Sequence, residues 1–248
     1  AGAYSTTGSV GGPPLNPGPQ IGDTGAGIHM AVAILAALRY RYETGKGQAI
    51  DMAMTDNVIN MQRSPFLYTL NTGKPVPRSG SGSPLGTSPW NVYKCKGDDP
   101  NDYVFACAPR DHNFTAMMKV IGREDLATMN WRVRQSPEMI PVLHDAIEAW
   151  TKSKTKKEAF KIFAEAGVPS APVLDTVEIL NDPHFIQRGI ITEVVHPQRG
   201  KHKMIGCPVK MSMSPVEVRS APTLGQHNEE IYKELLGLSV DELSQLKA

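Results

Sequence analysis

The sequence predicts an α/β protein in which a long apolar helix and a second helical segment precede a smaller α+β domain. Apolar residues recur at helical spacing between about residues 24 and 43. Shorter runs rich in β-branched and aromatic residues then alternate with further helical patterns, as is typical of layered α/β proteins. The chain of 248 residues is long enough for one large domain or two small ones.

The first helix is expected to be buried. Residues 1–22 are rich in Gly, Pro, Ser and Thr and predict a loop. In the helix that follows, Ile28, Val32, Leu35 and Leu38 share one face, and alanines fill much of the remainder. A helix that is apolar nearly all round normally packs against neighbours on several sides. Asp23 stands just before this helix, where a carboxylate side chain would cap the first turn.

Residues 48–53 predict a short strand, and a second helix is expected from Met54 or Thr55 to about Leu67. A composition break rich in Gly and Pro follows over residues 71–89. Such a segment is either a linker between domains or a lid that covers a site, and the pattern leaves both open.

Residues 90–185 predict a small α+β domain, and residues 186–248 a paired-strand segment followed by two closing helices. Thr176 is expected to cap a short helix, and Ser239 with Glu242 is expected to form a capping box. The expected elements are strands at 90–96, 103–107 and 168–174, helices near 111–121, 137–151, 155–166 and 177–181, a strand pair at 190–195 and 201–205, and helices at 224–235 and 239–246.

Composition excludes several classes of function. The formal net charge is +1, so no basic surface indicates nucleic-acid binding. Cys95, Cys107 and Cys207 form no close-spaced metal-binding pair, and an odd number of cysteines favours reduced thiols in a cytoplasmic protein. The longest apolar run, residues 28–38, is too short to span a bilayer. The sequence has no phosphate-binding P-loop, no H-E-x-x-H motif and no C-x-x-C motif.

The stretch with the most chemical content is residues 22–27, Gly-Asp-Thr-Gly-Ala-Gly. Glycines on both sides of Asp23 leave the backbone open to a large ligand. From the pattern alone Asp23 is either a helix cap or a nucleophile. His29, in the first turn of the helix, is expected to be a wall residue with a structural role.

Several segments in chain order resemble the class III CoA-transferases, and among them the formyl-CoA:oxalate branch. The matching segments are 22–29 (GDTGAGIH), 44–48 (TGKGQ), 51–56 (DMAMTD), 93–97 (YKCKG), 120–126 (VIGREDL), 166–169 (AGVP), 181–183 (NDP) and 224–227 (LGQH). Because these segments run over nearly the whole chain in the right order, they are specific as a set.

The resemblance implies a role for five residues. Asp23 would be the catalytic nucleophile that forms an acyl anhydride and then an aspartyl-CoA thioester. Met54 would contact CoA, and Gly80, Gly82 and Gly86 would belong to a loop that shields the anhydride from water. No permanently bound cofactor and no metal is implied, since CoA enters as the acyl-CoA substrate and a small carboxylate is its acceptor.

The resemblance also implies an architecture. Residues 1–70 and 186–248 would belong to a Rossmann-like large domain, residues 71–89 to a linker and loop, and residues 90–185 to the small domain. Family chains are longer and form interlocked homodimers. The abrupt beginning at Ala1 therefore favours a missing N-terminal portion, without which this chain is expected to be inactive and to bind CoA weakly.

Two other functions stay open. An acyl-CoA racemase of the same superfamily would use the matching aspartate as an acid or base together with a histidine. A non-catalytic fragment or partner subunit would use the same fold only as a scaffold. The Gly-rich loop and the Gly-Pro-Pro approach to Asp23 favour the transferase over the racemase.

Overall fold

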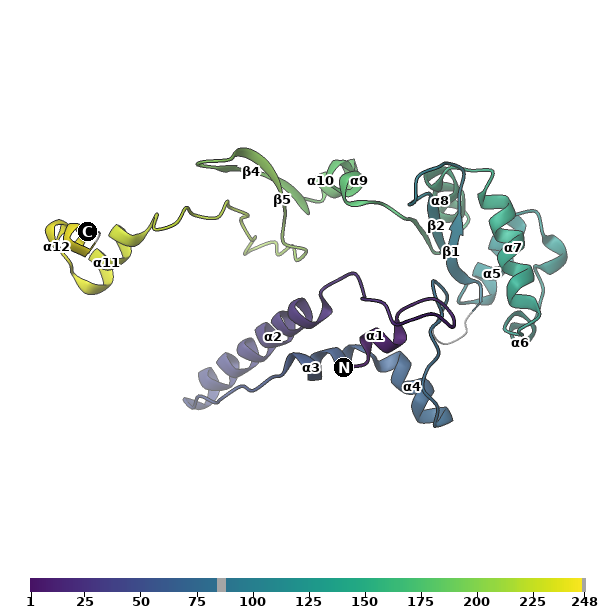
Figure 1. Cartoon of the computed structure of the whole chain (residues 1–248), viewed down its shortest axis with the longest axis horizontal. Helices are drawn as coiled ribbons and strands as arrows, with labels where there is room; N and C mark the ends of the chain where they lie inside the picture. Colours follow the sequence, from purple (N-terminus) through teal and green to yellow (C-terminus); the bar gives the residue numbers. More distant parts are fainter. Residues whose placement is uncertain (84–87, 247–248) are drawn as a thin grey trace. The chain divides into compact units, whose positions relative to one another are not determined.

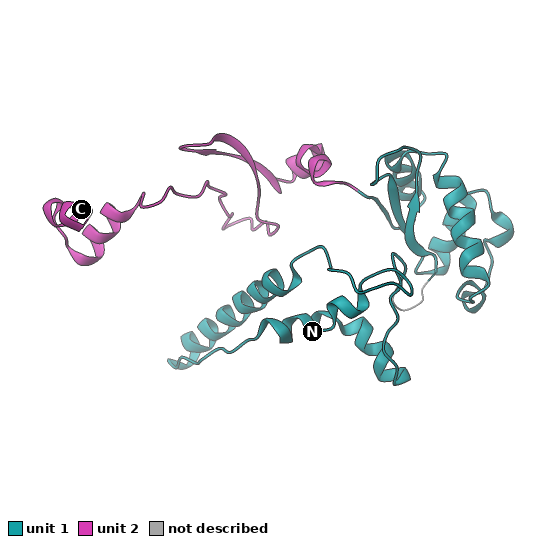
Figure 2. Ribbon diagram, in the orientation of Figure 1, with its two compact units in different colours: residues 1–173 teal, residues 174–248 magenta. Residues whose placement is uncertain are grey.

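The computed structural model describes residues 1–83 and 88–246, and it divides into two compact units, residues 1–173 and 174–248 (Figure 2). Its mixture of helices and sheets confirms the expected α/β class (Figure 1). Unit 1 contains α1 (Ala3–Thr6), α2 (Ile21–Thr44), α3 (Met54–Met61), α4 (Arg63–Thr72), β1 (Trp90–Lys94), β2 (Tyr103–Cys107), α5 (Asp111–Val120), the 3₁₀ turn η1 (Glu124–Leu126), α6 (Trp131–Arg134), α7 (Met139–Thr151), α8 (Lys156–Glu165) and β3 (Ser170–Pro172). Unit 2 contains α9 (Thr176–Asn181), α10 (Pro183–Gln187), β4 (Ile191–His196), β5 (Gly200–Ile205), α11 (Asn228–Leu236) and α12 (Val240–Leu246).

Helix α2 begins earlier than its sequence pattern predicts. Gln20 is the residue before the helix, so Asp23 lies inside the first turn and the prediction that Asp23 is the N-cap is wrong. The reason is tertiary: the Asn57 amide of α3 binds the carbonyl groups of Ile21 and Gly22, which holds these residues in the helix. At the other end Gly45 adopts φ +74°, and its N–H donates to the Arg41 carbonyl, a normal helix stop.

The expected burial of α2 is not met within this chain. Only Gly25 and Ala26 are buried, whereas Ile28, Val32 and Leu35 are 60%, 63% and 67% exposed. The whole helix has 24 residues and a mean hydropathy of 1.5 over an 18-residue window, so by length and composition alone it could cross a membrane. The argument from the shorter apolar run at residues 28–38 therefore does not hold for the full helix.

The predictions of a strand at residues 48–53 and of a single helix after it are also wrong. Residues 48–53 form no strand, because an extended segment needs a neighbouring strand and none pairs with it among the described residues. The single helix expected through Leu67 breaks at Gln62, into α3 and α4. Pro65 explains the break, since in a continuous helix its ring would collide with the Met61 carbonyl, whereas in the first turn of α4 it needs no N–H donor.

The strands of unit 1 form an antiparallel sheet in the order β1-β2-β3, with Val92 opposite Phe105 and Phe105 opposite Ala171. The expected strands at 90–96 and 103–107 are confirmed within two residues. Helices α5, α7 and α8 supply the rest of a core in which the side chains of Phe114, Ile147 and Phe163 are almost fully buried. This part of the chain buries its apolar residues with its own elements.

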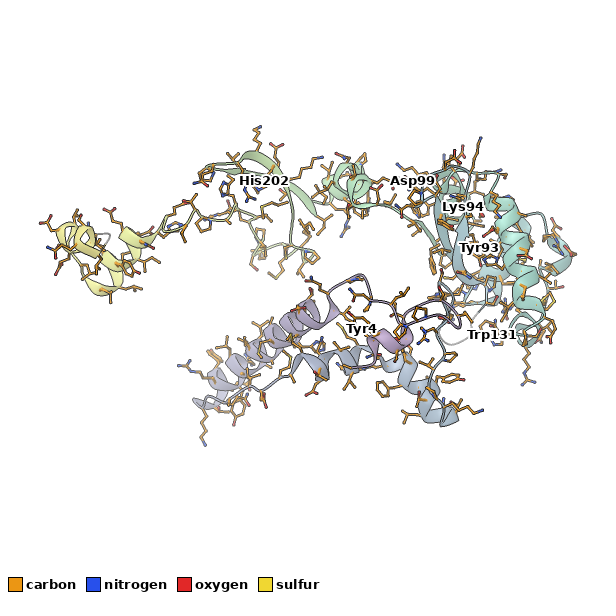
Figure 3. All side chains as sticks on the ribbon, viewed as in Figure 1. Tyr4, Tyr93, Lys94, Asp99, Trp131 and His202 are labelled. Atoms are coloured by element: carbon orange, nitrogen blue, oxygen red, sulfur yellow. The ribbon has the colours of Figure 1, made fainter. Side chains whose placement is uncertain are left out.

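Arg134 is the largest fully buried side chain in this part of the chain. Its guanidinium lies 4.3 Å from the centre of the Phe114 ring and 4.9 Å from that of Trp131, which is labelled in Figure 3. One of its Nη atoms donates to Asp111 at the start of α5. Stacking on aromatic faces suits the weakly hydrated guanidinium, so Arg134 joins α6 to α5.

Unit 2 begins with a capping box in which Asp175 and Glu178 bind each other's backbone N–H groups. Asp175 is therefore the N-cap of α9, and the prediction of Thr176 is wrong by one residue, because the carboxylate one position earlier already binds the free N–H of the first turn. Strands β4 and β5 pair antiparallel, as expected. The capping box of Ser239 and Glu242 at α12 is confirmed.

The core of the β1-β2-β3 sheet yields a first prediction. Ile147→Ala should lower the free energy of unfolding of this part by about 2–5 kcal/mol, because it leaves a cavity among fully buried side chains. Val142→Ala on the same helix is the control, since Val142 is 42% exposed and its loss should cost about 0.5 kcal/mol or less. Amide hydrogen exchange of β1 and β2 measures both, and equal effects would contradict the assignment of this core.

The cysteines yield a second prediction. Burial, aided by the charge of Asp102, raises the pKa of the Cys95 thiol from its ordinary 9.0 to about 11. The folded state thus holds this proton more tightly, so its contribution to stability is complete below about pH 9 and disappears as the pH rises to about 11. Iodoacetamide at about pH 9 should modify the half-buried Cys207 well before Cys95, as peptide mass spectrometry can measure. In urea, where the chain is unfolded, the modification rates of Cys95 and Cys207 should converge. Rapid modification of Cys95 in the folded protein would contradict the prediction, because it would show that the thiol is accessible.

Candidate functional site

Three segments of the chain surround a cavity of about 410 Å³. Residues 1–4 line one side, with Tyr4 of α1 labelled in Figure 3; the stretch from Asn16 to Asp23 lines another; and Met54, Thr55 and Val58 of α3 complete the wall. The cavity thus brings together Asp23 and Met54, the predicted nucleophile and the predicted CoA contact, from two different helices.

Asp23 has an environment suited to an accessible anion. Its side chain is exposed and lies in the first turn of α2, where the backbone N–H groups have no acceptors within the helix. The positive end of the helix dipole stabilises a carboxylate there by about 0.3–1 kcal/mol. Among the described residues that line the cavity, Asp23 alone has a charged side chain. A substrate can reach this carboxylate without displacing a salt bridge.

The direction of Asp23 depends on how α2 approaches α3. A Cβ atom at position 25 would lie 2.7 Å from Asn57 Nδ2 and 2.8 Å from Met61 Cε, so a larger residue there would force these side chains to move. Asn57 is 4% exposed, and its Nδ2 donates to the Ile21 carbonyl at 2.9 Å and to the Gly22 carbonyl at 3.3 Å. These two carbonyls immediately precede Asp23. Asn57 Oδ1 is buried without a partner among the described residues.

Sequence reasoning missed Asn57, although a signal was present. Met54, Val58 and Met61 recur at helical spacing on one side of α3, and Asn57 lies on that same side. A polar amide among apolar positions of an amphipathic helix normally has a specific hydrogen-bond partner when buried. Here its partners are the carbonyl groups of the turn that carries Asp23.

His29 is held by structural bonds, as expected of a wall residue. Its Nδ1 donates to the Gly25 carbonyl at 2.8 Å, and its Nε2 accepts a hydrogen bond from the Asn60 amide at 3.2 Å. Arg63 in turn donates to Asn60 Oδ1 at 2.9 Å. This network links α2, α3 and α4, and His29 does not line the cavity that contains Asp23.

Two of the three glycines of the predicted loop form backbone turns in the described residues. Gly80 adopts φ +61° and donates its N–H to the Gly8 carbonyl, and the Gly82 N–H closes a turn on the Ser79 carbonyl. Neither glycine lines the cavity that contains Asp23. Gly86, the third glycine of this prediction, lies outside the described residues.

Arg78 fastens the base of this loop to the N-terminal segment. Its Nε and Nη2 donate to the Gly12 carbonyl and its Nη1 to the Ser5 carbonyl. A second cavity, of about 650 Å³, lies beside Arg78 and is walled by α1, α4 and residues 75–78. It contains neither Asp23 nor Met54. Within the described residues no cluster of His, Cys, Asp and Glu is arranged to hold a metal ion.

A comparison with known families identifies the family of this chain. Residues 1–228 match the model of CoA-transferase family III, and the chain therefore belongs to that family.

Two of the matching relatives are formyl-CoA:oxalate CoA-transferases. A formyl-CoA:oxalate CoA-transferase of Streptomyces coelicolor is 38% identical over 262 residues, which cover all of this chain and 63% of the relative. One of Rhodopseudomonas palustris is 36% identical over 266 residues, with 99% and 62% covered. The chain therefore spans about three fifths of the length of these relatives.

Solved structures agree on the fold. A CAIB/BAIF family protein from Brucella suis is 25% identical and superposes with a TM-score of 0.73, covering 94% of this chain and 60% of that protein. Rv3272 from Mycobacterium tuberculosis, at 20% identity and a TM-score of 0.71, shows the same fold over 92% of this chain.

Proposed function

We propose that the full-length protein containing this chain transfers CoA from an acyl-CoA to a carboxylic acid, with formyl-CoA and oxalate as the first pair to test. The observation that carries the proposal is the exposed carboxylate of Asp23 in the first turn of α2, in a cavity shared with Met54. Family membership and the names of the relatives support the same chemistry.

The proposed reaction begins when an Asp23 oxygen attacks the thioester carbonyl carbon. The C–S bond breaks, leaving an aspartyl-acyl anhydride and CoA thiolate. The thiolate then attacks the aspartyl carbonyl, which gives an aspartyl-CoA thioester and releases the first acid. The acceptor carboxylate attacks this thioester, which breaks its C–S bond and gives a second anhydride and CoA thiolate. The thiolate then attacks the acceptor's carbonyl carbon, which forms the new acyl-CoA and releases the Asp23 carboxylate.

The first turn of α2 is suited to assist these steps. Each attack places negative charge on a carbonyl oxygen, and the free backbone N–H groups of the turn are donors for such a charge. Glycines at 22, 25 and 27 keep side chains away from the approach to Asp23. Water must be excluded because an anhydride hydrolyses readily, and the loop with Gly80 and Gly82 is proposed for that role.

Three features support the proposal that this chain completes its site with further protein. The cavity offers no cationic side chain for the phosphates of CoA, α2 exposes a broad apolar face, and residues 48–53 lack a partner strand in the described structure. We propose that the part of the protein outside this chain, together with a second subunit in an interlocked homodimer, covers these surfaces. A cytoplasmic location fits the reduced cysteines.

Asp23→Asn in the full-length protein should lower CoA transfer by about three orders of magnitude or more, because it removes the nucleophile. A panel of acyl-CoA donors and carboxylate acceptors measures the loss, and hydroxylamine with acyl-CoA should trap Asp23 in the wild type only. Asp56→Asn is the matched control, since Asp56 also lies in the first turn of a helix but outside the cavity. If the full-length protein inverts the configuration of an acyl-CoA and hydroxylamine does not trap Asp23, the result would favour a racemase. If the full-length protein has neither activity, the result would favour a scaffold.

The isolated chain should bind CoA at least 100-fold more weakly than the full-length protein, since the described residues that line its cavity include no Lys or Arg side chain for the phosphates. Isothermal titration of both proteins with CoA measures the difference. Tight binding by residues 1–248 alone would show that the CoA site is complete within them.

A further inference from the structure

We propose that Asn57 is a positioning residue that sets the direction of the Asp23 carboxylate. The proposal rests on the proposed CoA transfer and adds a residue to it that does not touch the substrate. Asn57 lies behind the cavity wall, whereas its neighbours Met54, Thr55 and Val58 on α3 line the cavity.

The contact itself is specific. The single Nδ2 group of Asn57 donates to two successive carbonyls, at 2.9 Å and 3.3 Å, and these belong to Ile21 and Gly22. The next residue is Asp23. Rotation of this first turn about the helix axis would break both bonds, so the amide determines which way the carboxylate faces.

Close packing at Gly25 accompanies these hydrogen bonds. Gly25 and Ala26 are the buried residues of α2 in the described structure, and Gly25 is buried directly against Asn57 and Met61. Asn57 Oδ1 lies 2.9 Å from the place where a Cβ of residue 25 would stand, and it has no hydrogen-bond partner among the described residues. An apolar side chain would avoid this unsatisfied acceptor, but it could not donate to the two carbonyls.

The kinetic consequence follows from this placement. Because Asn57 does not line the cavity, its loss should leave substrate binding, and hence KM, within about twofold of the wild type. A nucleophile displaced by about 1 Å loses on the order of 100-fold in rate. Asn57→Ala should therefore lower kcat by about 10- to 100-fold and slow the trapping of Asp23 by hydroxylamine to the same degree.

Asn113→Ala is the matched control. Asn113 is also a buried asparagine, 6% exposed, whose Nδ2 donates to a backbone carbonyl, that of Gly167, at 2.9 Å. It lies in the part of unit 1 built around the β1-β2-β3 sheet. Its loss should lower the melting temperature while kcat stays within about twofold of the wild type.

A second variant separates packing from hydrogen bonding. Gly25→Ala alone should lower the melting temperature, because its Cβ would collide with the Asn57 amide. In Gly25→Ala/Asn57→Ala the new methyl group occupies the vacated space and only the flexible end of Met61 has to move, so the melting temperature should recover relative to either single variant. Because the amide donor is still absent, kcat should stay low.

The outcomes distinguish the two proposals. If the wild-type protein transfers CoA through Asp23 while Asn57→Ala keeps its kcat, the positioning role is wrong and the transfer stands. If kcat recovers together with the melting temperature in the double variant, Asn57 acts only through packing. If the wild type forms no adduct at Asp23, the proposed transfer itself fails.

Discussion

The close approach of α2 to α3 at Gly25 is the constraint on which the candidate site depends. A hydrogen atom in place of a side chain lets the Asn57 amide reach the first turn of α2, and this contact brings Asp23 and Met54 to one cavity. A methyl group at position 25 would displace the Asn57 amide from its place against this turn. The close approach at this one small residue therefore places the Asn57 amide beside the turn that carries Asp23.

The chain contains two parts with opposite packing. Around the β1-β2-β3 sheet, helices α5, α7 and α8 each bury one apolar face, and even Arg134 is enclosed between aromatic rings. Residues 1–72 bury very little, although their sequence is similarly apolar. The first part is stable through contacts within this chain, whereas the second has the composition of an interior without the neighbours that an interior requires.

Local pattern was sufficient to predict some features and not others. The apolar spacing of α2 predicts its existence, and glycines around an aspartate predict an accessible carboxylate, because both depend on neighbours in sequence. The start of α2 at Ile21 and the role of Asn57 depend on a contact between segments about 35 residues apart, which no local pattern contains. Pro65 did signal the break near Gln62, but the apolar residues that continue past it concealed the signal. The strand expected at residues 48–53 needs a partner that the described residues do not provide.

The exposed apolar face of α2 has a consequence for the life of the protein in a cell. Chaperones and proteases recognise extended apolar surfaces, and they act on proteins in proportion to the time that such surfaces are open. A chain whose α2 stayed uncovered would be retained or degraded, so assembly would control its abundance. The exposed face of α2, the helix that carries the proposed nucleophile, would then mark unassembled chains for degradation. Only assembled protein, in which the site is complete, would cover this face and escape.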